Sequence, residues 1–302
     1  MNDDKNDKNF DETSSRPATP REDDCCGNSC NPCVFDVHKQ LLEQYNRRKA
    51  QGIENSRRNN FLNPLLYKIF SVKNILVVAD NYVKLVLDCS QQIERNSKII
   101  LLPGQHIILY AQNKKSRPYT PISWTNDSLE LLIKVYVNGE LSSYLANAKI
   151  ADEIRVRGPY GDFVYEKNRF SEIVAFCIGS GIAAIYPIAR SVVDEETDET
   201  RFHLVAGFRT TAEIPLRIEL QQLSDYWNVK CTLQISSPMW DGVSPNGIEI
   251  QRGRLNEFTF NELVKNCSTA KTLILICGTP KFNESLERWS RNRNFFHYHV
   301  FS

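Results

Sequence analysis

The sequence predicts an antiparallel β-barrel followed by a doubly wound parallel α/β sheet, with a short cysteine-rich helical segment in front of them. Up to about Tyr165 the chain shows short β-branched and aromatic runs broken by turn residues, and after Glu166 strand and helix patterns alternate. The length of 302 residues supports the division. At roughly 100–200 residues per domain, it leaves room for two domains and one small segment.

Composition and charge narrow the class of protein. Hydrophobic residues make up 41% and charged residues 24%, which is typical of globular chains. The net charge is +1, so no basic field points to nucleic acid. No apolar run reaches the roughly 18–20 residues of a transmembrane helix, and the start MNDDKNDKNFDE has no apolar signal core. We therefore expect a cytoplasmic protein with no transmembrane segment and no nucleic-acid partner.

The N-terminal region divides into three parts. Residues 1–24 hold many charges and few large apolar side chains, which predicts a disordered tail. Residues 25–52 combine cysteines with apolar residues at helical spacing, which predicts one helix. Asn31 is the expected N-cap and Pro32 the expected first helical residue. The Asn- and Arg-rich stretch 52–60 is typical of a linker.

Four cysteines, Cys25, Cys26, Cys30 and Cys33, lie within this helical module. The spacing of Cys30 and Cys33 allows two thiolates to share one metal ion, whereas adjacent residues seldom point both side chains at one ion. A metal site is therefore one interpretation. A reduced structural cap on the helix and a redox pair are the two others, and the sequence leaves all three open.

The barrel is predicted over residues 61–168. Its most evident strand runs are Tyr82–Asp88, Lys98–Leu102, His106–Tyr110 and Leu129–Val137. Turn-forming pairs such as Pro103-Gly104 and Asn138-Gly139 separate them. Short strands at this spacing favour an antiparallel barrel.

The parallel sheet is predicted over residues 169–302. The expected strands are Glu172–Ile178, Phe202–Phe208, Val229–Ser236, Thr272–Cys277 and Tyr298–Phe301. The expected helices are Ala183–Val193, Pro215–Tyr226, Asn256–Lys265 and Lys281–Arg291. Sheets of this kind bind ligands at the carboxyl ends of their strands.

Several short motifs could hold a phosphorylated ligand. Arg117-Pro-Tyr-Thr120 supplies a guanidinium that matches phosphate oxygens, a flat aromatic face and a hydroxyl. Gly139-Glu-Leu-Ser142 precedes a short helix whose first amides favour an anion. Each motif also has a plain structural explanation, an ordinary hairpin in the first case and a serine-capped helix in the second.

Two further motifs follow predicted strands of the sheet. The glycines of Gly179-Ser-Gly181 allow a pyrophosphate to approach the backbone closely, although a tight strand-to-helix turn explains them equally. Cys277-Gly-Thr-Pro280 stands at another carboxyl end of a strand. Both motifs therefore belong to the edge where such a sheet binds its ligand.

Taken in order, the series R-P-Y-T, I-K-V-Y, G-x-L-S, G-P-x-G, G-x-G-I and C-G-x-P resembles the ferredoxin reductase superfamily. It is most similar to the cytochrome b5 reductase branch, over about residues 64–302. The segment CCGNSCNPCVFD resembles the oxidoreductase-like cysteine module that precedes the reductase in cytochrome b5 reductase-like proteins. The resemblance therefore extends from the cysteine module to the end of the chain.

This resemblance implies FAD held between barrel and sheet, with the nicotinamide nucleotide on the sheet. The implied FAD contacts are Arg117, Pro118, Tyr119, Thr120, Ser123, Ile133, Lys134, Val135, Tyr136, Gly139, Leu141 and Ser142. The implied NAD contacts are Gly179, Ser180, Gly181, Ile182, Cys277, Gly278, Pro280 and Phe282. Thr120, near flavin N5, and Cys277, beside the nicotinamide, are the implied catalytic residues.

The implied activity is hydride transfer from NADH to flavin, followed by release of single electrons to an acceptor such as cytochrome b5. NADPH stays open as a donor. After the third strand of the sheet, the cytochrome b5 reductase branch often has an aspartate, which would repel the 2′-phosphate of NADPH. This chain has Ser236-Ser237 there, and Arg209 lies at the end of the neighbouring strand. We expect NADH as the donor, because that is what the resemblance implies.

The chain departs from the family pattern at three positions. Glu140 replaces a lysine near the expected pyrophosphate, and Ala183 and Ala184 replace a threonine and a proline. These changes raise an alternative function, a catalytically degenerate reductase fold that acts as a binding or interaction protein.

Overall fold

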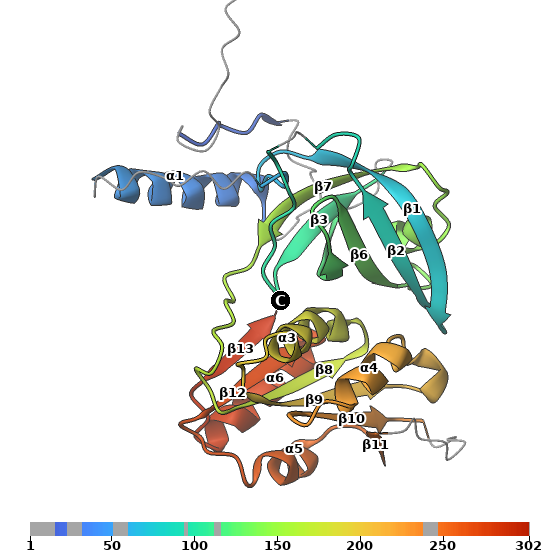
Figure 1. Cartoon of the computed structure of the whole chain (residues 1–302), viewed down its shortest axis with the longest axis vertical. Coiled ribbons are helices and arrows are strands. Elements are labelled where there is room, and N and C mark those ends of the chain that lie inside the picture. Colours follow the sequence, from blue (N-terminus) through green and yellow to red (C-terminus); the bar gives the residue numbers. More distant parts are fainter. Residues whose placement is uncertain are drawn as a thin grey trace, which may run out of the picture.

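The computed structural model describes residues 16–22, 32–50, 60–93, 96–111, 116–237 and 247–301. A barrel lobe stands above a parallel-sheet lobe, and one helix lies beside the barrel (Figure 1). Most of the predicted tail, Cys25, Cys26, Cys30, the predicted N-cap Asn31 and residues 52–59 of the predicted linker lie outside the described residues.

The barrel lobe is one antiparallel sheet with the strand order β4-β3-β7-β1-β2-β6-β5. Its strands are β1 (Lys68–Ala79), β2 (Tyr82–Asp88), β3 (His106–Tyr110), β4 (Arg117–Tyr119), β5 (Pro121–Trp124), β6 (Ser128–Lys134) and β7 (Glu153–Tyr160). The two edge strands, β4 and β5, are consecutive in the chain and separated by Thr120 alone. The sheet must therefore curl until its edges meet at Thr120, which closes the predicted barrel.

Alternate side chains of the strands fill the barrel. Leu85 and Leu87 of β2 and Leu129 and Leu131 of β6 are fully buried in one apolar cluster. Between β6 and β7 lies the helix α2 (Glu140–Ala146), whose Leu141 and Leu145 belong to the same cluster. This packing fixes where α2 begins relative to the strands.

The predicted strand Lys98–Leu102 is wrong, because this segment forms only a bridge between Lys98 and Asn60. The side chain of Asn60 occupies the backbone groups that a partner strand would use. Its amide nitrogen donates to Ile100 O at 2.8 Å, and Ile100 N donates to its oxygen at 3.0 Å. Single backbone hydrogen bonds also hold the segment, from Phe61 N to Lys98 O at 2.9 Å and from Ile99 N to Asn126 O at 2.8 Å, but they form no ladder.

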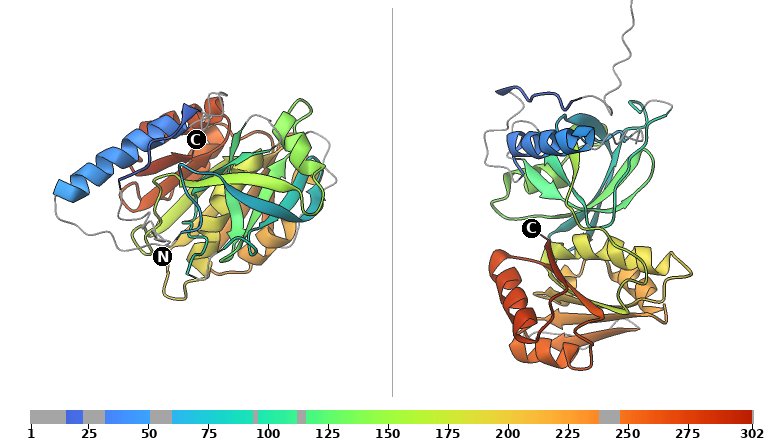
Figure 2. Two further views of the ribbon diagram at one scale, coloured as in Figure 1. Left: turned by 90° about the horizontal axis from the view of Figure 1, so that it is seen from above. Right: turned by 90° about the vertical axis from the view of Figure 1, so that its left-hand side faces the viewer.

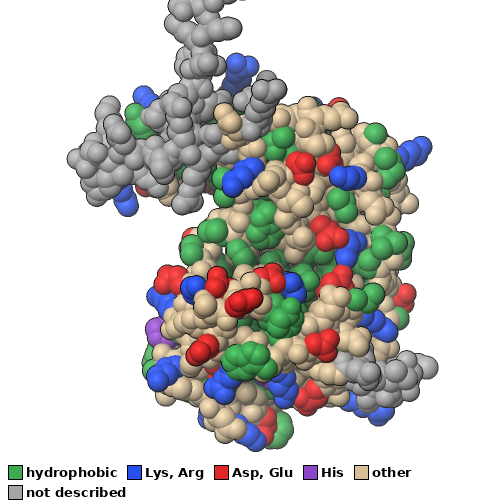
Figure 3. Space-filling model, in the orientation of Figure 1, with side chains coloured by type: hydrophobic (Ala, Val, Ile, Leu, Met, Phe, Trp, Pro, Cys, Tyr) green, Lys and Arg blue, Asp and Glu red, His purple; other side chains and the backbone are tan. Residues whose placement is uncertain are grey.

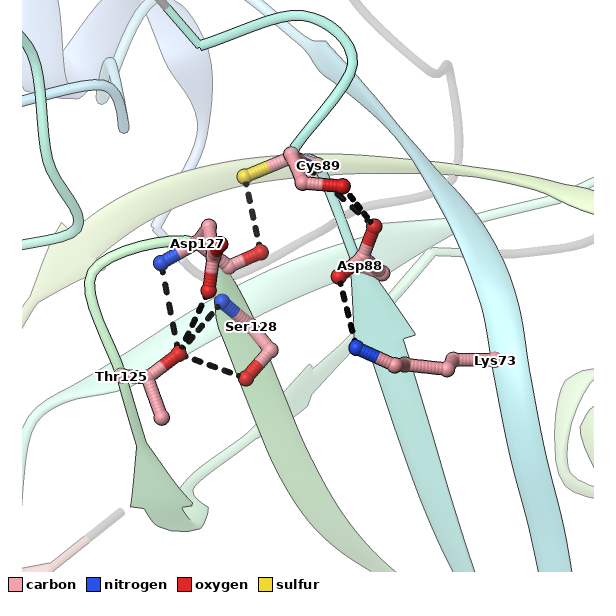
Figure 4. A network of polar contacts seen from close by, with 7 residues as sticks. Lys73, Asp88, Cys89, Thr125, Asp127 and Ser128 are labelled. Atoms are coloured by element: carbon pink, nitrogen blue, oxygen red, sulfur yellow. Dashed lines mark hydrogen bonds and ion pairs between the residues drawn. The ribbon is translucent and has the colours of Figure 1, made fainter.

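Polar contacts hold the end of β2 against the turn between β5 and β6 (Figure 4). Cys89 N and Cys89 Sγ both donate to Asp127 O, at 2.8 and 3.2 Å. Thr125 Oγ1 donates to Asp127 Oδ1 at 2.8 Å, and Lys73 Nζ lies 3.2 Å from Asp88 Oδ1. These contacts fix the register at this end of the barrel.

The second lobe is a parallel sheet with the strand order β11-β10-β9-β8-β12-β13. Its strands are β8 (Glu172–Ile178), β9 (Arg201–Phe208), β10 (Val229–Ile235), β11 (Ile248–Arg252), β12 (Thr272–Cys277) and β13 (Tyr298–Phe301). The strand β11 was not predicted from the sequence. It is an edge strand whose side chains are mostly polar, so its apolar alternation is weak.

Helices cover both faces of this sheet. They are α3 (Ile182–Val193), α4 (Arg217–Ser224), α5 (Glu257–Val264) and α6 (Pro280–Asn292), with short 3₁₀ turns η2 (Gly179–Gly181) and η3 (Thr211–Glu213). Residues of α3 and α4 share one buried cluster and residues of α5 and α6 another. The fold is the predicted one, a barrel followed by a doubly wound sheet.

The two lobes share a buried contact. Tyr82, Ile122 and Leu132 of the barrel lie in the same apolar cluster as Ile182 and Ile185 of α3. Because this contact is apolar and buried, it fixes how the barrel sits over the carboxyl edge of the sheet.

The first helix, α1 (Val34–Ala50), begins two residues later than the prediction, since Pro32 lies before it. Val37 N donates to Cys33 O at 3.0 Å, so Cys33 takes the N-cap position rather than the first turn. Val37 packs with Ile108 and Tyr160. The helix α1 lies along the outside of the barrel lobe (Figure 2). Among the described helices, none is long and apolar enough to cross a membrane.

Candidate active site

One large cavity lies where the two lobes meet. Its volume is about 1040 Å³, at the upper limit of the range usual for ligand pockets. The barrel contributes the seam between β4 and β5 and the start of α2, and the sheet contributes the carboxyl ends of its strands. Hydrophobic side chains gather at the meeting of the lobes (Figure 3).

Most of the residues singled out in the sequence line this cavity. From the barrel they are Arg117, Pro118, Tyr119, Thr120, Lys134, Tyr136, Gly139, Leu141 and Ser142. From the sheet they are Gly179, Ser180, Gly181, Cys277, Gly278 and Phe282. Residues far apart in the chain thus share one wall, as the order of the motifs suggested. Their individual roles stay predictions.

The remaining candidates are not on the cavity wall. Ile133 and Ile182 have no exposed surface and belong to the two apolar cores. Ser123 and Pro280 are exposed elsewhere, and Val135 packs against the barrel core. Strand alternation explains Ile133, whose neighbour Lys134 points the opposite way, into the cavity.

The barrel side of the cavity carries cations and aromatic rings. The Arg117 guanidinium is exposed at the seam, and its Nη1 donates to Ser116 O at 2.8 Å. Lys134 Nζ lies 5.2 Å from the centre of the Tyr82 ring and 5.9 Å from that of Tyr136. Burial raises the pKa of Tyr119, so its hydroxyl stays protonated at neutral pH. This wall offers positive charge beside flat apolar surface.

Two glycines of the cavity wall lie close to neighbouring atoms. A Cβ on Gly181 would lie 2.3 Å from Cys277 O, so only glycine lets η2 run this close to the end of β12. A Cβ on Gly139 would lie 2.3 Å from Ser142 Oγ, which donates to Gly139 O at 3.2 Å. Both glycines keep backbone exposed at the wall, where a ligand can approach it.

Cys277 ends β12 on the cavity wall. Burial raises the pKa of its thiol to about 12, so the thiol is neutral at physiological pH. A neutral thiol is a weak nucleophile. Cys277 is therefore suited to packing against a bound group and to weak hydrogen bonding rather than to covalent catalysis.

An aromatic corner of the cavity, which was not predicted from the sequence, is formed by His106, Phe163, His299 and Phe301. The ring centre of Phe163 lies 4.9 Å from that of His299 and 5.2 Å from that of Phe301. Burial lowers the pKa of His106 to about 4, and its Nε2 is buried without a hydrogen-bond partner among the described residues. Position at a strand's carboxyl end could have indicated Phe301, but no local pattern marks His106.

These observations fit a flavin nucleotide. The aromatic and apolar surfaces suit a flat ring system, and the two cations suit phosphate oxygens. His106 Nε2 is a buried polar atom that has no hydrogen-bond partner among the described residues. The donor set and the cavity volume therefore agree with FAD.

Comparison with known proteins identifies the domains. Residues 70–165 match the oxidoreductase FAD-binding domain, 176–288 the oxidoreductase NAD-binding domain, and 12–53 the N-terminal oxidoreductase-like domain. The cytochrome b5 reductase domain of Ulva prolifera nitrate reductase has the same fold, with a TM-score of 0.70 and 20% identity. That likeness covers 80% of this chain and 100% of the other.

Two curated relatives match nearly the whole chain. The NADH-cytochrome b5 reductase-like proteins of Homo sapiens and Mus musculus are each 32% identical to it, over 287 and 296 residues. In both cases the match covers 90% of this chain and 90% of the relative. With the cysteine module, the FAD-binding domain and the NAD-binding domain in the same order, the chain belongs to the NADH-cytochrome b5 reductase-like family of oxidoreductases.

Proposed function

We propose that this protein is an FAD-dependent reductase that oxidises NADH and passes single electrons to a small haem protein such as cytochrome b5. The observation that carries the proposal is the cavity between the lobes, whose wall collects most of the candidate residues of both. The relatives described as NADH-cytochrome b5 reductase-like support the choice of donor and acceptor.

The proposal divides the chain by role. Residues 61–168 would bind FAD and residues 169–302 the nicotinamide nucleotide, with residues 25–52 as the oxidoreductase-like module. The matches to FAD-binding and NAD-binding domains support the two larger assignments.

The barrel wall would hold the FAD. Arg117 would pair with the phosphates, because a guanidinium forms two parallel hydrogen bonds to phosphate oxygens. Tyr119 would cover the flat ring and Thr120, at the seam, would place its hydroxyl beside it. When bound, FAD supplies the chemistry of accepting a hydride and releasing electrons one at a time.

The sheet wall would position the nicotinamide nucleotide. Gly181 and Gly278 have no side chains, so the backbone after β8 and β12 stays accessible. A side chain there would block the approach of the nucleotide. Cys277 would contact the nicotinamide as a neutral thiol. The aromatic corner near Phe301 would exclude water, and this exclusion would strengthen electrostatic interactions in the cavity.

The test is haem reduction by the full-length protein with FAD, NADH and cytochrome b5. We expect haem reduction that depends on all three and that falls at least about tenfold in Arg117→Ala, which lacks the phosphate partner. The matched control is Arg169→Ala, since Arg169 pairs with Glu166 on the surface away from the cavity. FAD-loaded protein that leaves the haem oxidised would contradict the proposal.

A second candidate function is non-catalytic binding by the same fold. Glu140, Ala183 and Ala184 all line the cavity, so the three departures from the family pattern lie at the candidate site itself. A protein that binds FAD or nucleotide but oxidises neither NADH nor NADPH would support this second function.

A further inference from the structure

The cavity continues along the sheet beyond the glycine turn. After β8 it is lined by Gly179, after β9 by Arg209, after β10 by Ser236 and after β11 by Arg254. Neighbouring strands lie about 4.8 Å apart, so β8 and β11 are separated by about 14 Å. The cavity therefore extends from the end of β12 to the opposite edge of the sheet.

Backbone hydrogen bonds hold the last three of these turns side by side. Ser236 N donates to Phe208 O at 3.0 Å, and Ser237 N donates to Arg209 O at 2.8 Å. Gly253 N donates to Ile235 O at 2.9 Å. Arg209, Ser236 and Arg254 are thus presented from adjacent, fixed positions at one end of the cavity.

The end of the cavity lined by Arg209, Ser236 and Arg254 would receive the adenosine half of the nucleotide. This assignment rests on the proposed function. If the nicotinamide lies by Cys277 and Gly181, the rest of the molecule would extend along the edge toward β9, β10 and β11, where the cavity continues. In such sites an acidic side chain binds the 2′-hydroxyl of NAD, whereas an arginine accommodates the 2′-phosphate of NADP.

The charges at this end favour a phosphate. Arg254 is exposed and has no ion pair among the described residues. Arg209 has an 80% exposed side chain, and its Nε lies 4.0 Å from Glu213 Oε1. That contact leaves the two terminal nitrogens of the guanidinium open to a ligand. Glu213 is the single carboxylate that the described residues contribute to this end of the cavity wall.

We propose that Arg209, Ser236 and Arg254 form a 2′-phosphate subsite, so that this protein takes NADPH as well as NADH. The two guanidinium groups would pair with the phosphate oxygens, and the Ser236 hydroxyl would donate to the same group. The serine in this place carries no charge that would repel a phosphate.

The test measures binding of nucleotide fragments to the FAD-loaded full-length protein by titration calorimetry. The probes are adenosine 2′,5′-bisphosphate and adenosine 5′-monophosphate, which differ by the 2′-phosphate alone. We expect the bisphosphate to bind at least about tenfold more tightly, and the difference to shrink at high salt. Equal binding of the two probes, tighter binding of the monophosphate, or binding of neither overturns the proposal.

Variants locate the subsite. Arg209→Gln and Arg254→Gln should each reduce the preference for the bisphosphate severalfold, and Ser236→Asp should reverse it. The matched control is Arg201→Gln, because Arg201 is an exposed arginine at the opposite end of β9. Its preference should equal that of the unaltered protein. A preference unchanged in all three subsite variants would place the phosphate elsewhere and contradict the assignment.

This experiment separates the subsite from the proposed reductase activity. Fragment binding needs no electron transfer, so a preference for the bisphosphate in a protein that oxidises no nucleotide would support the subsite and contradict the reductase. NADH oxidation by a protein that shows no preference for the bisphosphate would support the reductase and contradict the subsite.

Discussion

Glu140 places a carboxylate on the cavity wall at the first residue of α2. A negative charge stabilises the start of a helix, but in this place it would also repel the phosphates of FAD. We expect Glu140→Lys to tighten FAD binding by about tenfold, corresponding to about 1.4 kcal/mol. Flavin fluorescence on dilution measures the release. Glu153→Lys, at the start of β7, is the control, and a weaker hold on FAD in Glu140→Lys would contradict the placement.

Gly181 lies where η2 approaches the end of β12 most closely. A Cβ there would be 2.3 Å from Cys277 O, and a backbone oxygen cannot swing aside as a side chain can. Gly181→Ala should therefore displace the turn and raise the KM for NADH at least about tenfold, with FAD retained because the barrel is untouched. Ser191→Ala, near the other end of α3 and off the cavity wall, should leave KM within about threefold of normal. An unchanged KM in Gly181→Ala would show that the nucleotide binds elsewhere.

At the residue scale, the sequence predicted those site residues that belong to a recognisable motif beside a turn. Arg117, Gly181 and Cys277 were found because each belongs to a motif at a strand end. His106 could not be found, since its place on the cavity wall depends on how the barrel lobe sits over the sheet lobe. Ile133 shows the opposite error, since it was predicted to contact FAD but is buried in the barrel core. A motif consists of consecutive residues, whereas a strand points their side chains to opposite faces.

Among the elements, an ion-pair cluster joins the barrel to the sheet lobe. Lys84 Nζ of β2 lies 2.6 Å from Glu219 Oε1 of α4 and 3.5 Å from Glu130 Oε1 of β6. Burial alone would lower the pKa of Lys84, but the hydrogen bond and charge of Glu219 and the charge of Glu130 raise it above 10.5. The lysine is therefore charged in the neutral range and holds two carboxylates together.

We expect Lys84→Met to lower the free energy of unfolding by about 1–2 kcal/mol, because it leaves two half-buried carboxylates facing each other. Urea denaturation at pH 7 measures this loss. Since the folded pKa of Lys84 is raised, its contribution is full below about pH 10.5 and is lost as the pH rises through the folded-state value. Lys73→Met removes an exposed pair and should change stability by less than about 0.5 kcal/mol. Equal effects of the two variants would contradict this account.

Long and regular elements were predictable, whereas two kinds of segment were not. Strands β8, β12 and β13 have the predicted bounds, because their apolar runs end abruptly at turn residues. The segment at Lys98 was misassigned because the side chain of Asn60 takes the place of a partner strand. The strand β11 was missed because an edge strand needs little apolar surface.

For the whole molecule, the question is how far the N-terminal module matters to the reductase body. Its helix α1 reaches the barrel through Val37 and Leu41, which pack against Ile108, Tyr160 and Leu65 on the outer face. Deletion of residues 1–52 should preserve FAD binding and NADH oxidation, since the cavity is lined by residues from Gly104 onward. It should lower the Tm, because the outer face of β3 is uncovered.

The full-length Val37→Ala variant is the matched control for this deletion and should reproduce part of the fall in Tm. Loss of FAD on deletion would show that the module belongs to the site. Elemental analysis of the full-length protein tests the metal interpretation of Cys25, Cys26, Cys30 and Cys33. Absence of both zinc and iron would remove it, and leave the structural cap and the redox pair.

The central claim is that the cavity between the lobes brings a bound flavin and a nicotinamide nucleotide together. The most direct measurement is an anaerobic titration of the purified full-length protein with NADH, followed by the visible absorption of its flavin. We predict that the protein carries FAD and that about one equivalent of NADH bleaches this band. A flavin band that stays unchanged with both NADH and NADPH would contradict the claim.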